Sequence, residues 1–415
     1  MRVLIISPHP LTWQDPGSIT FASLFSAFRK EEIGQIVIGD PRHEPDLVKT
    51  WQVIGPKNVR ADQIVRSIMG FRRSKKENSS IVRDVVTTNI GKQLLLSAYA
   101  DAMPITFTRK DSDWLHEFAP TVIYTTLGSI RCIKTALWVK KLCDVPIVLH
   151  YMDDWLDMQY SSLLTHMPRK MLLHLNMKIA NNASVHLAIS PQMAKQYAMK
   201  FGRSFKPFMH CVNVPSVLSK QRNDAGLRLV YAGGLHLYRD DVLCQIGRVI
   251  QECNGRIDGV CASIDCYAPE SHLCTYRDKL EKAGVCCQRS LNPYEVADVI
   301  SKYDCLVHAE SFNPQAYRYT KLSISTKIPQ YLATGIPILA VGPKQQAAIE
   351  YLCSNNAAVG VHDLNNDSIK KALSIMTDRK RMNEIRSNAY GLAINNHSIV
   401  SESRKFRDII ASAKC

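Results

Sequence analysis

Short runs of consecutive hydrophobic residues alternate with longer amphipathic segments along almost the whole chain. The runs contain few polar positions, which is typical of parallel strands covered on both faces of a sheet. The longer segments repeat apolar residues at helical spacing. The predicted strands are RVLIIS, QIVIG, TVIYTT, PIVLHY and SVHLAIS in the first half, and RLVYAG, GVCAS, VCCQ, DCLVHA and PILAV in the second. This alternation predicts an α/β fold built from doubly wound, Rossmann-like parallel sheets.

A break in the alternation divides the chain of 415 residues into two halves. Residues 214–227 (VPSVLSKQRNDAGL) are polar and aperiodic, so they predict a linker between a domain of residues 1–213 and a domain of residues 228–390. In such sheets ligands bind beyond the carboxyl ends of the strands, so two facing domains would hold a ligand in a cleft between them. Residues 391–415 predict a final amphipathic helix that docks on a domain. Its apolar positions are Ile399, Val400, Phe406, Ile409 and Ile410.

Composition narrows the class of protein. Hydrophobic residues make up 46% and charged residues 21% of the chain, as in ordinary globular proteins, and no apolar run is long enough to span a bilayer. The opening MRVLIIS predicts a buried strand rather than an export signal. The thirteen cysteines are therefore expected to be reduced thiols in a cytoplasm. Because they lack CxxC or CxxH spacing, we expect no metal site.

The chain carries a net charge of +15, most of it in the first half. Residues 1–215 hold 27 Lys and Arg against 17 Asp and Glu, and the remainder holds 25 against 20. Basic residues concentrate in VRADQIVRSIMGFRRSKK, residues 59–76. Such a surface favours an anionic partner, namely phosphate groups, nucleic acid or an anionic membrane. The alternative is a solvated helix face, and nucleic acid is disfavoured because aromatic residues are not interleaved with the basic ones.

The second half offers a candidate phosphate site. Gly233 and Gly234 follow a strand, and Arg239 stands where the next helix begins. Glycines at such a turn let a phosphate approach the backbone, and the helix start offers free N–H donors. The alternative is a tight turn with a surface arginine, and the GxGxxG dinucleotide pattern is absent. Glu310 follows the strand DCLVHA, either as a ligand contact or as a cap of the next helix.

The stretch STKIPQYLATGIPILAVGP, residues 325–343, predicts a helix turn followed by a buried strand. Lys327 and Gln330 are three residues apart and share one helix face, away from the packing residues. Together with Thr326 they are candidate donor-binding residues, one helix away from Glu310.

The first half holds candidates of its own. His150 follows the predicted strand Ile147–Leu149 directly, with Asp153 soon after, and could bind a hydroxyl or act as an acid or base. The alternative is that His150 has only a structural role. Gly17 and Ser18 lie in the first strand-to-helix loop, where Ser18 could cap the helix or touch a ligand.

These motifs resemble those of the GT-B glycosyltransferases, in particular glycosyltransferase family 4. That family holds the donor pyrophosphate with a G-R-x-x-x-x-K-G turn, in which Gly233 matches the glycine and Arg239 the lysine. Gly234 stands in place of the family's arginine, and Lys327 is a plausible substitute cation.

The resemblance also covers the donor's ribose and sugar. Gln330 lies where the family has a ribose-binding glutamate, five residues before Gly335. Glu310 matches the family's other glutamate, but it lies twenty residues before Gln330 rather than eight, and a longer loop is expected between them. His150 and Gly17 match a histidine near the transferred sugar and a glycine loop near donor and acceptor.

The resemblance implies metal-independent transfer of a sugar from a nucleotide diphosphate to a hydroxyl of a glycan or lipid-linked acceptor, in surface-polysaccharide synthesis. Both retaining and inverting mechanisms fit, and in an inverting enzyme His150 or an aspartate near it, such as Asp153, is the expected base. Residues 1–213 would take the acceptor side and residues 228–390 the donor, and the final helix, residues 391–415, would cross back to pack on the N-terminal domain. The protein is expected in the cytoplasm or at the inner membrane face, bound through its basic N-terminal half. The alternatives are a non-catalytic GT-B sugar-binding protein and a GT-B-fold sugar-nucleotide epimerase.

Overall fold

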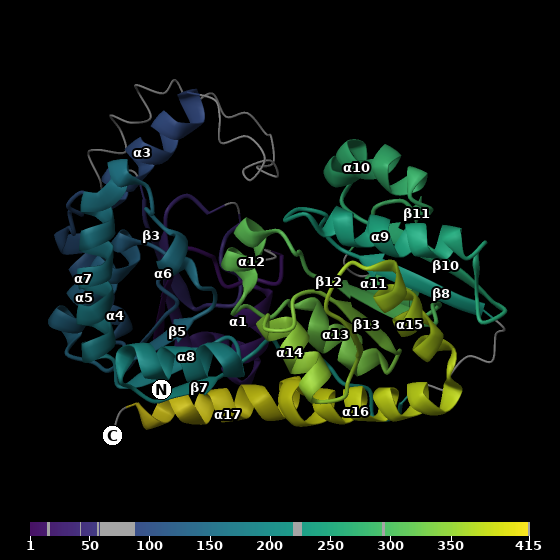
Figure 1. Ribbon diagram of the computed structural model, residues 1–415. Helices are drawn as coiled ribbons and strands as arrows, with labels where there is room; N and C mark the ends of the chain where they lie inside the picture. Colours follow the sequence, from purple (N-terminus) through teal and green to yellow (C-terminus); the bar gives the residue numbers. More distant parts are fainter. Residues whose placement is uncertain are drawn as a thin grey trace. The chain divides into compact units, whose positions relative to one another are not determined.

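A computed structural model describes residues 1–14, 17–41, 43–55, 58, 88–218, 226–292 and 295–413, with the backbone alone for residues 88–94 (Figure 1). The described residues form two compact units. The first runs to Cys211 and resumes at Ile399, and the second runs from Val212 to Ser398. The basic segment 59–76 and residues 219–225 of the expected linker lie outside the described residues.

The first unit is built on a sheet in which every pairing is parallel, with strand order β3-β2-β1-β4-β5-β6-β7. The strands are β1 (Val3–Ser7), β2 (Ile33–Ile38), β3 (Thr50–Ile54), β4 (Val122–Thr125), β5 (Ile147–Tyr151), β6 (Val185–Ala188) and β7 (Phe205–Pro207). The helices are α1 (Ile19–Leu24), η1 (Phe25–Ala27), η2 (Lys30–Glu32), α3 (Thr88–Ala102), α4 (Arg109–Phe118), α5 (Ile130–Cys143), α6 (Trp155–Met158), η4 (Leu163–Thr165), α7 (His166–Asn182), α8 (Pro191–Phe201) and α17 (Ile399–Ser412).

The second unit repeats this plan, with strand order β11-β10-β8-β12-β13-β14 and β9 paired antiparallel with β10. The strands are β8 (Gly226–Ala232), β9 (Arg256–Ile257), β10 (Val260–Tyr267), β11 (Val285–Cys287), β12 (Cys305–Ala309), β13 (Ile338–Val341) and β14 (Val359–Val361). The helices are α9 (Arg239–Glu252), α10 (Glu270–Lys282), α11 (Val296–Ile300), α12 (Pro314–Thr320), α13 (Lys327–Thr334), α14 (Ala347–Ser354), α15 (Asn366–Thr377) and α16 (Arg379–His397).

Both sheets confirm the predicted doubly wound fold class. The central strands are buried along their whole length, as their continuous apolar runs require. In each sheet, successive strands are added first on one side of the first strand and then on the other. This switch lies between β1 and β4 in the first unit and between β8 and β12 in the second. Ligands of open α/β sheets bind at such a switch point, beyond the carboxyl ends of the strands. Among the described residues, no helix is both long and apolar enough to cross a membrane.

The tail, expected as one helix, forms two, because Ser398 adopts an extended conformation between α16 and α17. In α17 the fully buried Phe406 packs its ring against Phe25, Tyr124 and Phe208 of the first unit. Burying a phenylalanine in this way contributes about 2–3 kcal/mol.

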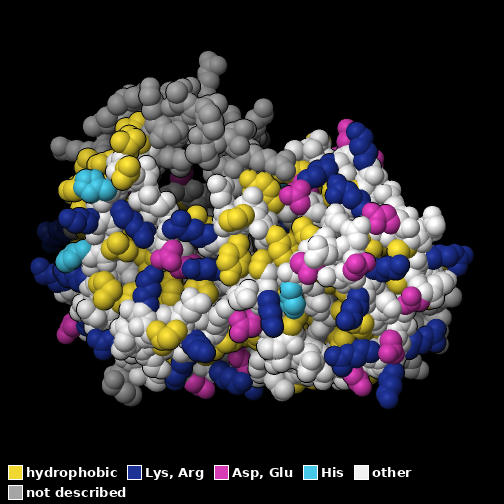
Figure 2. Space-filling view, in the orientation of Figure 1, with side chains coloured by type: hydrophobic (Ala, Val, Ile, Leu, Met, Phe, Trp, Pro, Cys, Tyr) yellow, Lys and Arg dark blue, Asp and Glu magenta, His cyan; other side chains and the backbone are white. Residues whose placement is uncertain are grey.

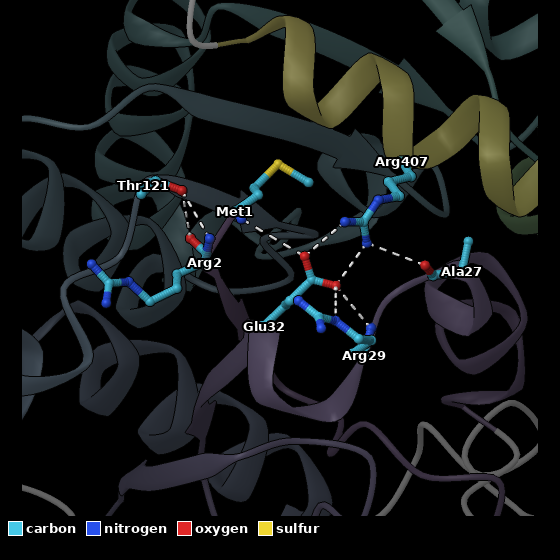
Figure 3. Close-up of polar contacts among 7 residues, drawn as sticks. All are labelled: Met1, Arg2, Ala27, Arg29, Glu32, Thr121 and Arg407. Atoms are coloured by element: carbon cyan, nitrogen blue, oxygen red, sulfur yellow. Dashed lines mark hydrogen bonds and ion pairs between the residues drawn. The ribbon is translucent and has the colours of Figure 1, made fainter.

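An ion pair next to this aromatic cluster also holds α17 to the first unit (Figure 3). Both nitrogens of the Arg407 fork donate to the Glu32 carboxylate, at 2.8 Å and 2.7 Å. The hydrogen bond from Arg407 lowers the pKa of Glu32 to about 2. Arg407 also donates to the carbonyl of Ala27, at the end of η1.

Candidate functional site

Two predicted site residues meet at the switch point of the second unit. Gly233 directly follows β8 and Glu310 directly follows β12, its neighbour in the sheet. Gly233 has a φ of +151°, and a Cβ atom there would collide with the Lys327 side chain. The turn therefore needs glycine, both for its backbone conformation and for the space that Lys327 occupies.

Arg239, the first residue of α9, points its guanidinium at Glu310. Its Nη2 lies 3.3 Å from Glu310 Oε2, and both side chains are nearly buried, at 12% and 5% exposure. The Arg239 Nε is buried without a hydrogen bond in the described part of the chain. Burial alone would raise the pKa of Glu310, but the charge of Arg239, and next the neighbouring His308, outweigh it and lower that pKa to about 2. Glu310 is thus a carboxylate at neutral pH, and the arginine retains unused donor capacity for a ligand.

Lys327 brings a second cation to the same place. Its Nζ lies 4.3 Å from the centre of the Tyr231 ring, a cation–π contact. Burial, and next the charge of Arg239, lower the pKa of Lys327 to about 7. Two cations held beside one carboxylate favour binding of an anion, which would relieve their repulsion.

As predicted, α13 buries one apolar face, and its opposite face is exposed. Ile328, Tyr331 and Leu332 are buried, and Gln330 is exposed. Thr326 occupies the N-cap position, but its side chain does not cap the helix. The structure therefore places Lys327, but not Gln330, against the glycine turn.

The segment between Glu310 and Thr326 corrects two expectations. It was expected to be a loop, but it contains the helix α12. That helix is capped by Asn313, whose side chain accepts from the backbone N–H groups of Gln315 and Ala316. Glu310 is therefore not the cap of the next helix.

Two further side chains support the glycine turn and a third lies beside Glu310, and the sequence pattern assigned none of them a role. The Tyr231 hydroxyl donates to the Gly234 carbonyl at 2.6 Å, and His272 Nδ1 accepts from the Leu235 N–H at 3.1 Å. His308 Nε2 lies 3.3 Å from Glu310. A polar residue inside an otherwise apolar strand was the available signal for Tyr231 and His308, whereas His272 lies on α10, where no pattern pointed to it.

The expected position of His150 is wrong. It lies inside β5 rather than after it, and its side chain is fully buried. Its Nδ1 is 2.8 Å from the Tyr124 hydroxyl, and its ring packs against Tyr124 and Phe406. Burial lowers the pKa of His150 to about 3, so the imidazole is neutral. These contacts favour the structural alternative over a role in acid–base chemistry.

The other first-unit candidates lie in loops that follow strands. Gly17 precedes α1, and a Cβ atom there would meet the His9 ring at 2.6 Å. Ser18 is at the N-cap position of α1 but does not cap it, because its hydroxyl donates to the Pro10 carbonyl. Asp153 is half-buried in the loop after β5. The structure thus brings together the second-unit candidates Gly233, Gly234, Arg239, Glu310 and Lys327, while Gly17, Ser18, His150 and Asp153 belong to the first unit.

Comparison with known proteins matches no protein-family model and no curated protein, but solved structures match along the whole chain. HepE from Anabaena in complex with UDP aligns with a TM-score of 0.63 and 12% identity, over 99% of this chain and 100% of that one. The apo lipopolysaccharide outer core galactosyltransferase WaaB aligns with a TM-score of 0.55 and 12% identity, over 100% of both chains. Sucrose-phosphate synthase from Thermosynechococcus elongatus aligns at 0.58 and 10%, over 99% and 100%. These likenesses confirm the predicted GT-B fold.

Proposed function

We propose that this protein is a glycosyltransferase that moves a sugar from a nucleotide diphosphate sugar to a hydroxyl of a glycan or lipid-linked acceptor. The observation that carries the proposal is the meeting of Arg239 and Lys327 with the Gly233–Gly234 turn at the switch point of the second unit. HepE, which shares the fold, has been solved with UDP and with UDP-glucose.

The chemistry requires stabilisation of a departing diphosphate. In the proposed reaction the bond between the sugar's anomeric carbon and the diphosphate oxygen breaks, and negative charge collects on that oxygen. Lys327 and Arg239 are the cations that would receive this charge, and Gly233 would let the phosphate approach the backbone. Glu310 would orient Arg239 and contact the sugar hydroxyls. Since two cations serve this purpose, we propose a metal-independent reaction.

The finer features of the proposal rest on the family 4 resemblance. We propose retention of configuration, because His150, an expected base of an inverting enzyme, is too deeply buried to serve as a ready base. We propose a role in surface-polysaccharide synthesis, in line with the lipopolysaccharide enzyme WaaB among the structural neighbours.

A transfer assay tests the proposal. The protein is incubated with a panel of nucleotide sugars and candidate acceptors in the presence of EDTA, and released nucleotide diphosphate is measured. We expect release with at least one donor, and a loss of about 100-fold or more in Arg239→Ala and Lys327→Ala. Arg381→Ala and Lys371→Ala, on exposed side chains of α16 and α15, are the matched controls. Equal activity in the site variants and the controls would refute the site, and complete inhibition by EDTA would refute metal independence.

A non-catalytic sugar-binding protein is the second candidate. It is favoured by Gly234 in place of the family's arginine and by the exposed, uncharged Gln330. In that case a nucleotide diphosphate would bind without any turnover, whereas an epimerase would change the sugar without an acceptor. The same assay, with chromatography of the sugar nucleotide, separates all three.

A further inference from the structure

An exposed apolar surface lies on α7 and on the turn η4 that precedes it. Leu163 and Leu164 are adjacent in η4 and are 92% and 69% exposed. The inward side of α7 packs through Pro168, Leu172, Asn176, Ile179 and Ala180. Its outward side is apolar too, through Met167, Met171, Leu173 and Met177, which are 39–56% exposed. A helix on the surface of a globular unit normally keeps this side polar, so the exposed residues indicate a binding surface.

The charge around this surface has one sign. Between Asp157 and Asp224 the sequence contains no Asp or Glu. The outward side of α7 carries the exposed Lys170 and Lys178 among its apolar residues. We call the six apolar residues and these two lysines the α7 face: Leu163, Leu164, Met167, Met171, Leu173, Met177, Lys170 and Lys178. Where α7 lies in this view, Figure 2 shows hydrophobic side chains interspersed with Lys, Arg and His.

The neighbouring helix α5, which packs against α7, extends the basic character. Its sequence, IRCIKTALWVKKLC, contains four Lys or Arg and no acidic residue. Two of these cations, Arg131 and Lys140, pair with Asp101 and Asp144, and Lys134 and Lys141 are the other two. The nearest acidic groups are already engaged. Asp101 is buried and accepts hydrogen bonds from the start of α5, and Asp144 and Asp157 pair with Lys140 and Lys200. The face would therefore attract an anionic surface and repel a cationic one.

The turn that carries the two leucines is held in place and has its polar groups paired. The Leu164 carbonyl accepts from the Tyr99 hydroxyl at 3.1 Å. The Leu164 N–H donates to the Ser162 hydroxyl, and the Thr165 N–H donates to the Ser162 carbonyl. Side chains of such a turn can enter an apolar medium without leaving these backbone groups unsatisfied in their hydrogen bonds. Arg169 is not part of the face, because it donates to the carbonyls of Leu156 and Gln159.

We propose that the α7 face docks on the surface of an anionic phospholipid bilayer. Leu163 and Leu164 would enter the boundary between headgroups and acyl chains, with the methionines of α7 lying along it. Lys170 and Lys178 would pair with lipid phosphates. The interspersion of lysines with apolar residues fits this partner better than a protein, since a protein interface concentrates its apolar residues in a core depleted of lysine. The inference does not depend on the proposed enzymatic activity.

Vesicle co-sedimentation of the full chain tests the inference without nucleotide or sugar. The vesicles contain phosphatidylcholine alone or phosphatidylcholine with 30% phosphatidylglycerol. We expect binding to the anionic vesicles alone. We expect a loss of tenfold or more in affinity for the double variants Leu163→Ser/Leu164→Ser and Lys170→Glu/Lys178→Glu. The controls are Val400→Ser, at a residue 60% exposed on α17, and Lys370→Glu/Lys371→Glu, on exposed lysines of α15. Circular dichroism confirms that each variant is folded.

Three outcomes would overturn the inference. The first is no binding to anionic vesicles, and the second is equal binding by wild type and both double variants, which would place the contact elsewhere. The third is a homodimer in sedimentation equilibrium that Leu163→Ser/Leu164→Ser dissociates, which would make the face a contact between copies of this chain. Because the transfer assay is run separately on a soluble acceptor, failure here leaves the proposed activity standing, and the reverse also holds.

Discussion

At the scale of single residues, Gly233 is the position whose identity the site constrains most tightly. A Cβ atom there would meet the Lys327 side chain, and the backbone adopts a positive φ. We expect Gly233→Ala to weaken nucleotide diphosphate binding by tenfold or more, because Lys327 must move. Gly255→Ala is the matched control, since Gly255 also has a positive φ (+68°) but has open space where its Cβ would lie. That control should lose about 1 kcal/mol of stability and keep its affinity, as measured by calorimetry and urea unfolding. Equal loss of affinity in both variants would contradict the account.

Lys327 gives the site a predicted dependence on pH. Burial and Arg239 lower its pKa to about 7 in the free protein, and a bound diphosphate would raise that pKa by pairing with the ammonium. The bound form therefore holds more protons above pH 7, so affinity should fall as pH rises, by up to about tenfold per pH unit. Lys327→Arg should remove this dependence because arginine stays charged. Dissociation constants between pH 6.5 and 9 test this, and parallel profiles for wild type and Lys327→Arg would contradict it.

Local sequence located some candidate residues correctly in the fold and misplaced others, for a physical reason. Gly233, Arg239 and Lys327 were identified because glycine turns and helix starts are local features, and sheet pairing then brings them together. His150 was misplaced because the consecutive apolar residues end at Leu149, whereas β5 continues to Tyr151 and places the histidine in the core. The burial of a side chain depends on the tertiary structure, and a difference of one residue in the strand's end changes whether His150 is buried.

At the scale of elements, a partly buried ion pair between Arg407 and Glu32 stabilises α17 in addition to the packing of Phe406. Arg407 lowers the pKa of Glu32 to about 2. A carboxyl whose folded pKa is depressed adds stability above its unfolded pKa of about 4.3, and loses it as pH falls towards 2. We expect Arg407→Ala to lower the free energy of unfolding by about 1–3 kcal/mol at pH 7, and by clearly less at pH 3. Arg404→Ala, on an exposed residue of the same helix, should change little. Urea unfolding at both pH values tests this, and an equal loss at pH 3 and pH 7 would show that the ion pair is not the cause.

The helix α12 shows what element prediction from one sequence misses. The stretch NPQAYRYTKLSIST was expected to be a longer loop because Glu310 lies twenty residues before Gln330, where the family has a spacing of eight. It forms a helix because Asn313 caps two backbone N–H groups and Pro314 occupies the first position. This capping signal, Asn followed by Pro, is present in the sequence.

At the scale of the whole molecule, the fold was the most predictable feature. Apolar runs that alternate with amphipathic segments require parallel sheets covered on both faces, and the two strand orders confirm this. The α7 face was not predicted. Apolar residues occur on all sides of this helix, so the sequence does not show which of the methionines and leucines are exposed. The basic character of the first half was visible from composition, and the structure shows which helices carry part of it.

The central claim is that the second unit binds a nucleotide diphosphate between Arg239, Lys327 and the Gly233–Gly234 turn. Calorimetric titration of UDP, ADP and GDP into wild type, Arg239→Ala and the control Arg381→Ala tests it most directly. The account predicts saturable binding of at least one nucleotide, a loss of tenfold or more in Arg239→Ala, and no change in Arg381→Ala. No binding of any of the three, or equal affinity in Arg239→Ala and wild type, would contradict it.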